Sequence, residues 1–311
     1  MAQPIVEAIQ LTKAYEDVKV VDRLDLKIDE GQIFGFLGPN GAGKTTTILM
    51  LLGLTEPTSG EARVCGYNAT RDPLHVKRIT GYLPENVGFY EDMTAAENLR
   101  YIIRLNGISD KQATEKIGEV LQIVGLDNVT NQEVGKFSKG MKQRLGIACV
   151  LAKEPRLVVL DEPTTGIDPE GVNEILDLIG SMAKDKGIAV LLCSHLLHQV
   201  QRICDRVGIV SKGRMVAEGL IQQMGKKIIG GGQNELEVQV NHSNAALIRT
   251  IKSIPSVISV DRSGHTLSVR SNEDVRDKVA QAIFEGGSLP LQMKSQDYAL
   301  EEIYMKYFRE A

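Results

Sequence analysis

The sequence predicts an α/β fold, with a parallel sheet that carries a phosphate-binding loop, followed by a smaller α+β domain. Two observations predict the sheet. An apolar strand at 33–37 leads directly into a glycine-rich loop at 38–45, and a second apolar strand at 157–160 ends in two carboxylates. The second domain is predicted by a change in the residue pattern after 229–234. Before this segment the strands are continuous apolar runs, and after it apolar and polar residues alternate.

The loop at 38–45 reads GPNGAGKT and matches the phosphate-binding pattern G-x-x-x-x-G-K-[ST] at every fixed position. Its glycines allow the backbone to wrap around a polyphosphate, and the helix expected over 46–52 presents its positive end to the same anion. Lys44 adds a charge for the β- and γ-phosphates, and the Thr45 hydroxyl can ligate Mg²⁺. A plain glycine turn would not need all four fixed residues. We therefore expect a nucleoside triphosphate to be bound by Gly38, Pro39, Asn40, Gly41, Ala42, Gly43, Lys44, Thr45 and Thr46.

Composition narrows the class of protein. At 311 residues the chain can hold one large domain and a smaller one. The 36 Lys and Arg against 40 Asp and Glu give a net charge of −4, which argues against nucleic acid as a partner. No apolar run approaches the roughly 18 residues that a membrane span needs, and the first residues lack a signal-peptide pattern. The four cysteines form no C-x-x-C pair, so reduced thiols in the cytoplasm are expected.

The second motif is the strand at 157–160 with the two carboxylates that follow it. A buried parallel strand ends at the ligand-facing edge of an open sheet. Asp161 is therefore expected to hold Mg²⁺ through water, and Glu162 to polarise the water that attacks the phosphate. The alternative is a strand that merely ends in a charged turn, and the phosphate loop in the same chain favours the catalytic interpretation.

Two weaker motifs complete the set. The stretch 137–144 precedes an apolar helix expected over 145–152, and Ser138 taken alone would be interpreted as a helix N-cap. His195 follows a strand expected over 188–192, and a lone histidine in such a place is usually structural.

In their order along the chain, these motifs resemble the ATP-binding cassette (ABC) ATPases over roughly residues 5–225. The resemblance implies a P-loop NTPase cassette with a RecA-like core and a helical insert at about 86–155. It also implies an ATP- and Mg²⁺-dependent ATPase in which two copies of the chain sandwich two ATP molecules. Each ATP lies between the phosphate loop of one copy and the signature motif of the other.

The same resemblance assigns roles to single residues. Tyr15 corresponds to the aromatic residue that stacks on adenine, and Val20 is expected beside the nucleotide. His195 matches the switch histidine, and Asp168 lies in the loop between subunits. The signature positions, which would contact the γ-phosphate across the dimer, are Ser138, Gly140 and Met141.

The chain departs from the family pattern, because the usual signature Leu-Ser-Gly-Gly-Gln reads FSKGM at 137–141 and keeps only the serine and the second glycine. Met141 replaces a glutamine of the signature, and Glu85 replaces the glutamine that senses the γ-phosphate. Glu85 brings a carboxylate near Mg²⁺ and joins Glu162 and His195 as a candidate catalytic residue. Both substitutions are similar to one branch of the family, in which the ATPase serves a separate small membrane permease of an exporter. The stretches 81–86, 138–144 and 300–304 carry this narrower resemblance.

The predicted cassette spans 1–228, a glycine-rich linker spans 229–234, and the second domain spans 235–311. The second domain is expected to have a βαββαβ order and a final helix. Its elements are a strand at 236–240, a helix at 244–254, strands at 257–261 and 266–269, a helix at 272–285, a strand at 289–293 and a helix at 298–309. The sequence leaves open whether this domain extends a dimer interface or senses a ligand.

The resulting hypothesis is an ATPase on the cytoplasmic face of the membrane, powering a permease that docks near Phe89 and Tyr90. An importer subunit is one alternative. A soluble ATPase without a transport role is another, although the chain has one cassette and no heptad run between Lys44 and Ser138. The transported substrate is not readable, because in this family the permease selects it.

Overall fold

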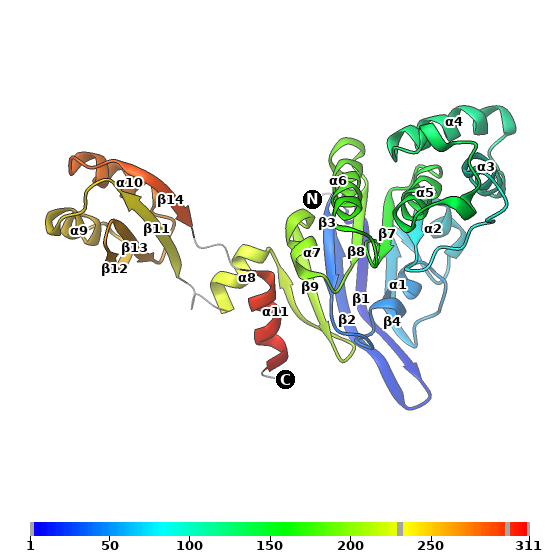
Figure 1. Ribbon diagram of the computed structural model, residues 1–311. Coiled ribbons are helices and arrows are strands. Elements are labelled where there is room, and N and C mark those ends of the chain that lie inside the picture. The colour runs from blue at the N-terminus through cyan, green and yellow to red at the C-terminus, as the bar shows by residue number, and fades with distance from the viewer. Residues whose placement is uncertain (1–2, 229–232, 296–298, 310–311) are drawn as a thin grey trace. The chain divides into compact units, whose positions relative to one another are not determined.

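The computed structural model describes residues 3–228, 233–295 and 299–309, which form two compact units that divide between Glu218 and Gly219 (Figure 1). The predicted linker lies largely outside the described residues. Helix α8 (Ile221–Ile228), which the sequence analysis assigned to the cassette, groups with the second unit.

A six-stranded sheet forms the centre of the first unit. Its strand order is β10-β9-β3-β8-β7-β6, and β9, β3, β8, β7 and β6 pair in parallel. Every residue of β3, β7 and β8 is buried, as their apolar runs predict. The strands are β3 (Ile33–Leu37), β6 (Thr80–Leu83), β7 (Leu157–Asp161), β8 (Ala189–Cys193), β9 (Arg206–Ser211) and β10 (Arg214–Gly219). Helices of this core are α1 (Lys44–Leu51), α2 (Pro73–Ile79), α6 (Pro169–Lys186) and α7 (Leu197–Ile203).

A second, antiparallel sheet packs against this core. Its order is β2-β1-β4-β5, formed by β1 (Val6–Tyr15), β2 (Val18–Ile28), β4 (Ser59–Val64) and β5 (Tyr67–Asn68). One continuous cluster of buried side chains joins the two sheets and α1, with Leu24 from β2, Phe36 from β3 and Ile48 from α1 among its members. This cluster fixes the phosphate loop between the sheets, because the loop connects β3 to α1.

The chain between β6 and β7 forms a helical insert, whose helices gather on one side of the first unit (Figure 1). It contains α3 (Ala95–Leu105), α4 (Asp110–Ile123), two short 3-10 turns (Asp127–Val129 and Val134–Lys136) and α5 (Lys139–Leu151). A capping box of Thr94 and Glu97 begins α3, and the Ser138 hydroxyl caps α5. The last helix therefore begins six residues before the predicted apolar segment.

The second unit contains the predicted βαββαβ arrangement. Its sheet order is β12-β13-β11-β14 with antiparallel pairing throughout, and buried residues such as Val238 and Leu267 pack against Val279. The elements are β11 (Asn234–Val240), α9 (Ala245–Lys252), β12 (Val257–Ser263), β13 (Thr266–Ser271), α10 (Arg276–Glu285), β14 (Pro290–Ser295) and α11 (Leu300–Arg309). Helix α10 begins four residues later than predicted, because the Asp274 carboxylate accepts the Arg276 N–H and holds a turn there.

The loop ahead of α3 is organised by one buried amide. Asn98, only 3 % exposed, accepts a hydrogen bond from the N–H of Tyr90. Its Nδ2 lies within 3.0–3.3 Å of the carbonyl oxygens of Tyr90, Met93 and Thr94. One side chain thus satisfies backbone groups on both sides of the loop.

We expect Asn98→Ala to destabilise the protein by about 1–3 kcal/mol, because several buried backbone groups lose their partner at once. Thermal unfolding of the full chain measures the effect. Asn106→Ala is the matched control, since Asn106 is exposed and its amide donates to a single carbonyl, that of Ile102. Equal melting temperatures for the two variants would show that the loop is held by other contacts.

Candidate functional site

The phosphate loop leaves β3 through a tightly packed turn. Gly41 and Gly43 have φ angles of 78° and 97°, which side-chain-bearing residues rarely adopt. A Cβ atom on Gly43 would lie 2.6 Å from the carbonyl oxygen of Val20, and one on Gly38 would lie 2.4 Å from that of Val210. The loop therefore packs closely against Val20 on one side and Val210 on the other. Its glycines leave the backbone N–H groups accessible to an anion.

Lys44 lies at the start of α1 and is 9 % exposed. Its ammonium group donates to the carbonyl oxygens of Gly38, at 2.7 Å, and Pro39, at 3.1 Å, so the side chain folds back over the loop. Thr45 is exposed and Thr46 is half-buried. The rest of the predicted set lies around Lys44 on the same loop, with Pro39, Asn40 and Gly41 exposed and Ala42 buried.

Asp161 ends β7 at the same edge of the sheet as this loop, because Cys193 of β8 pairs with both Phe36 and Asp161. Burial raises the pKa of Asp161, and the charge of Glu162 raises it further, whereas Lys44 opposes this shift and Glu85 adds to it. A hydroxyl and a carboxylate beside further acidic groups form an environment that favours a hard cation. The chemistry of these groups fits Mg²⁺, and its binding by Thr45, Asp161 and Glu85 stays a prediction.

Glu162 and His195 meet at the ends of β7 and β8. His195 Nδ1 lies 2.9 Å from Glu162 Oε2, with Glu162 only 12 % exposed and His195 56 % exposed. Glu162 has a φ of 51° and its N–H donates to the carbonyl oxygen of Cys193, so the backbone aims this carboxylate out of the sheet. The two residues that were predicted independently from the sequence thus form one pair.

Three polar residues around this pair were missed by the sequence analysis. The Thr165 hydroxyl lies 3.4 Å from Glu162 Oε2, and the buried Thr164 donates to Gln199 of α7. Burial and the neighbouring Asp161 raise the pKa of Tyr82 to about 12. No sequence pattern distinguishes these residues, because only the folded structure shows which groups they lie beside.

The signature residues lie together at the start of α5. The Ser138 hydroxyl accepts the N–H of Met141 at 3.2 Å, which leaves the other N–H groups of the first turn unpaired within the helix. Gly140 faces the side chain of Ile167, at 3.6 Å from the position of a Cβ. Asp168, next in the chain, caps α6 through the N–H of Gly171. The signature helix and the Asp168 loop are therefore neighbours within one chain.

In the described part of the chain, no hydrogen bond or ion pair links the signature residues to the phosphate loop. Tyr15, at the end of β1, is half exposed, and its ring lies 5.0 Å from the ammonium of Lys13. Val20 is half-buried on β2 and Glu85 is exposed after β6.

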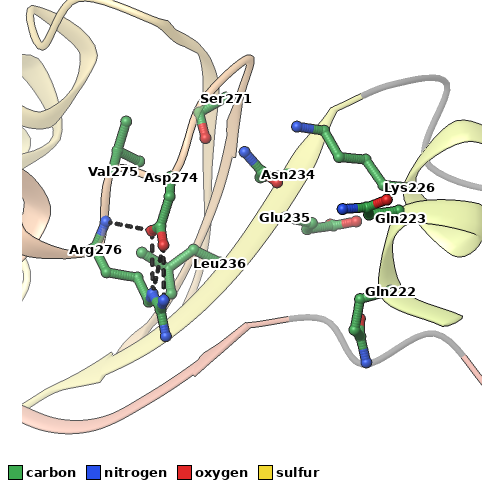
Figure 2. Close-up of a pocket in the computed structure, with 10 residues that line it drawn as sticks. All are labelled: Gln222, Gln223, Lys226, Asn234, Glu235, Leu236, Ser271, Asp274, Val275 and Arg276. Atoms are coloured by element: carbon green, nitrogen blue, oxygen red, sulfur yellow. Dashed lines mark hydrogen bonds and ion pairs between the residues drawn. The ribbon is translucent and has the colours of Figure 1, made fainter. Parts of the chain in front are cut away.

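A separate hollow of about 250 Å³ lies in the second unit, between α8, β11 and the turn before α10 (Figure 2). Leu236 and Val275 form its apolar lining, and Lys226 extends toward it from α8. Asp274 and Arg276 are already paired with each other there. The hollow contains none of the nucleotide-site residues.

Comparisons with known proteins agree with this geometry. The family model described as ABC transporter matches residues 21–165. The bacitracin transport ATP-binding protein BcrA of Bacillus licheniformis is 38 % identical over 302 residues, which cover 97 % of this chain and 96 % of that protein. The linearmycin resistance ATP-binding protein LnrL of Bacillus subtilis is 31 % identical, with 97 % of each chain covered.

Solved structures give the same result. An ATP-binding subunit of an ABC transporter superposes with a TM-score of 0.65 and 32 % identity, over 72 % of this chain and 92 % of that one. A dimeric ATP-binding cassette bound to ADP and Pi has a TM-score of 0.63 and 23 % identity, over 69 % and 98 % of the two chains, and supports the fold alone. The chain belongs to the ABC transporter family, as the ATP-binding and ATP-hydrolysing subunit that powers a transporter.

Proposed function

We propose that ATP is bound with its phosphates in the loop 38–46, and that Asp161 and Glu162 act on them from the end of β7. The single observation that carries this proposal is the strand register: Phe36 of β3 pairs with Cys193 of β8, and Cys193 pairs with Asp161 of β7, so the loop and the acidic strand end lie at one edge of the sheet. Lys44 pairs with the β- and γ-phosphates in exchange for the carbonyl groups that it now contacts. Tyr15 stacks on the adenine ring and Val20 lies beside it.

For hydrolysis, Glu162 polarises the attacking water and His195 holds Glu162 in line through its 2.9 Å contact. Glu85 lies on the γ-phosphate side of Asp161. Mg²⁺ held by Thr45 and Asp161, with Glu85 acting through water, would supply charge neutralisation at the phosphates. In the described ranges no three His, Cys, Asp or Glu residues are grouped to hold a metal, so phosphates and water would complete its coordination.

The second half of each site comes from a second copy of the chain. Ser138, Gly140 and Met141 supply a capped helix start with unpaired N–H groups, which suits a partner's γ-phosphate. Asp168 lies beside this helix start and contacts the partner's loop. The solved cassette bound to ADP and Pi is itself a dimer, and we propose a sandwich dimer as the working form of this chain.

We further propose that the transporter is an exporter with a separate permease, and that this subunit works at the cytoplasmic face of the membrane. Relatives that cover nearly the whole chain are named for bacitracin transport and linearmycin resistance. No helix in the described part of the chain has the length and apolarity to cross a bilayer. An importer subunit is the second candidate, and co-purification of the permease from membranes with transport assays in both directions separates the two.

The permease docks on the insert near Phe89 and Tyr90. Tyr90 is 55 % exposed, and its ring meets that of Tyr101 edge-on at 5.2 Å. Phe89, the preceding residue, is half-buried. It follows Gly88, where a Cβ atom would have no neighbour within 4 Å. Exposed aromatic side chains of this kind dominate interface energies.

Lys44→Ala should weaken ATP binding by about tenfold or more, because the phosphates lose a charge-assisted partner in a partly dehydrated site. Isothermal titration calorimetry with a non-hydrolysable ATP analogue measures the affinity. Lys116→Ala serves as the control, since Lys116 pairs with Glu154 on the surface of the insert. Wild-type affinity in Lys44→Ala would remove the phosphate-loop assignment.

Glu162→Gln should lower ATP turnover by about a hundredfold or more while leaving binding intact, because the amide keeps the shape and loses the base. ATP then persists, and light scattering should detect an ATP-dependent dimer. Glu170→Gln, an exposed change in the first turn of α6, should alter neither property. Normal turnover in Glu162→Gln would transfer the role of base to another group.

The double change Phe89→Ala and Tyr90→Ala should abolish co-purification of the permease while the isolated subunit keeps its ATPase rate, because the anchor rings lie outside the nucleotide site. Tyr67→Ala is the matched control, as Tyr67 is also exposed and stacks only on His75. Circular dichroism confirms that each variant is folded. Permease binding by a folded double variant would contradict the docking site.

A further inference from the structure

The turn between β9 and β10 lies directly against the phosphate loop. The Gly213 N–H donates to the carbonyl oxygen of Ala42 at 3.0 Å, and its own carbonyl accepts the N–H of Asp22 at 2.9 Å. Gly213 has a φ of 79°, and a Cβ there would lie 2.5 Å from the carbonyl oxygen of Val20. One residue therefore joins the phosphate loop, β2 and the hairpin by its backbone.

An ion pair beside Gly213 fixes this junction. Arg214 Nε donates to Asp22 Oδ2 at 2.8 Å, and Arg214 Nη2 donates to the same oxygen. Asp22 is only 7 % exposed, and Lys19 and Arg23 approach its other oxygen at 3.6 and 3.5 Å. The hydrogen bond from Arg214 holds the pKa of Asp22 below its usual value, although burial acts against this shift. Asp22 is therefore a charged anchor on β2, and Arg214 connects it to the hairpin.

We propose that Asp22 and Arg214 are positioning residues for ATP, which hold the Gly213 turn against Ala42 and so set the shape of the phosphate loop. This inference rests on the proposed binding of ATP in that loop. Neither side chain contacts the nucleotide. They act through two backbone hydrogen bonds, from Asp22 to Gly213 and from Gly213 to Ala42.

The location of the pair determines which kinetic constant it controls. The junction contacts the binding loop at Ala42 and the adenine-side strand at Val20, which are both parts of the ATP-binding surface. Glu162 and His195 are held instead by the ends of β7 and β8. These two strand ends are joined by a hydrogen bond from the Glu162 N–H to the Cys193 carbonyl oxygen. Loss of the pair should therefore weaken ATP binding and leave the chemical step unchanged.

The test replaces Arg214 by Met, which keeps the length of the side chain and removes its charge. We expect the Kd of a non-hydrolysable ATP analogue and the KM for ATP to rise by about three- to tenfold, with kcat within about twofold of wild type. Arg214→Lys should recover most of the affinity. Asp22→Asn, which keeps the shape of the anchor, should shift affinity in the same direction as Arg214→Met.

Arg206→Met is the matched control, because Arg206 of β9 pairs with Glu218 of β10 at 2.7 Å, at the end of the hairpin away from the Gly213 turn. Its Kd should equal that of the wild type even if its melting temperature falls. Unchanged affinity in Arg214→Met, or an equal loss in Arg206→Met, would overturn the positioning role.

Lys44→Ala shows whether a negative result contradicts only the positioning role or the nucleotide site as well. If Lys44→Ala loses ATP and Arg214→Met does not, the positioning role alone is wrong. If Lys44→Ala also binds ATP normally, the proposed nucleotide site is wrong and this inference fails with it.

Discussion

The parallel pairing of β3, β8 and β7 is the constraint on which the candidate site depends. Phe36 pairs with Cys193, and Cys193 pairs with Asp161, so three strand ends lie level at one edge of the sheet. The candidate site residues follow these ends along the chain: the loop with Lys44 comes after β3, Glu162 directly after β7 and His195 two residues after β8. Because all residues of these strands are buried, a shift of register would expose apolar side chains and would also separate Glu162 from His195.

Electrostatics at this edge favours a bound nucleotide. Burial raises the pKa of Asp161, and the charges of Glu162 and Glu85 raise it further, so negative charge at this edge is unfavourable without a cation. Lys44 offsets part of this charge within the chain. A metal–nucleotide complex brings a cation for the carboxylates and an anionic phosphate for Lys44. The site is in this sense complementary to the complex more than to either component alone.

The sequence was most informative where function depends on local order. Strand β3 was predicted with its observed bounds, and the loop, the acidic strand end and the histidine were all located from short motifs. The βαββαβ order of the second unit was also predicted, since alternation and turn residues are local signals. The start of α10 was missed because a side chain of Asp274 competes with the helix for the backbone, which periodicity does not record.

Long-range pairings were beyond sequence reasoning. Asp22 and Arg214 are 192 residues apart in the chain, and each resembles an ordinary surface residue in its own segment. Thr164 and Gln199 meet only because α7 folds back on the loop after β7. The grouping of α8 with the second unit depends in the same way on contacts outside its own segment, such as the packing of α8 against α11. The predicted domain boundary remains a prediction.

Burial of the cysteines, among them the Cys193 that supports Glu162, affects how the protein responds to thiol reagents. The carbonyl of Cys193 accepts the Glu162 N–H, and burial raises the pKa of this thiol well above its usual value. Burial likewise raises the pKa of Cys65, Cys149 and Cys204. Since the thiolate is the reactive form, the four native cysteines are poor targets for alkylation at neutral pH. A new cysteine placed on the surface is therefore expected to take a fluorescent or spin label faster than the natural ones.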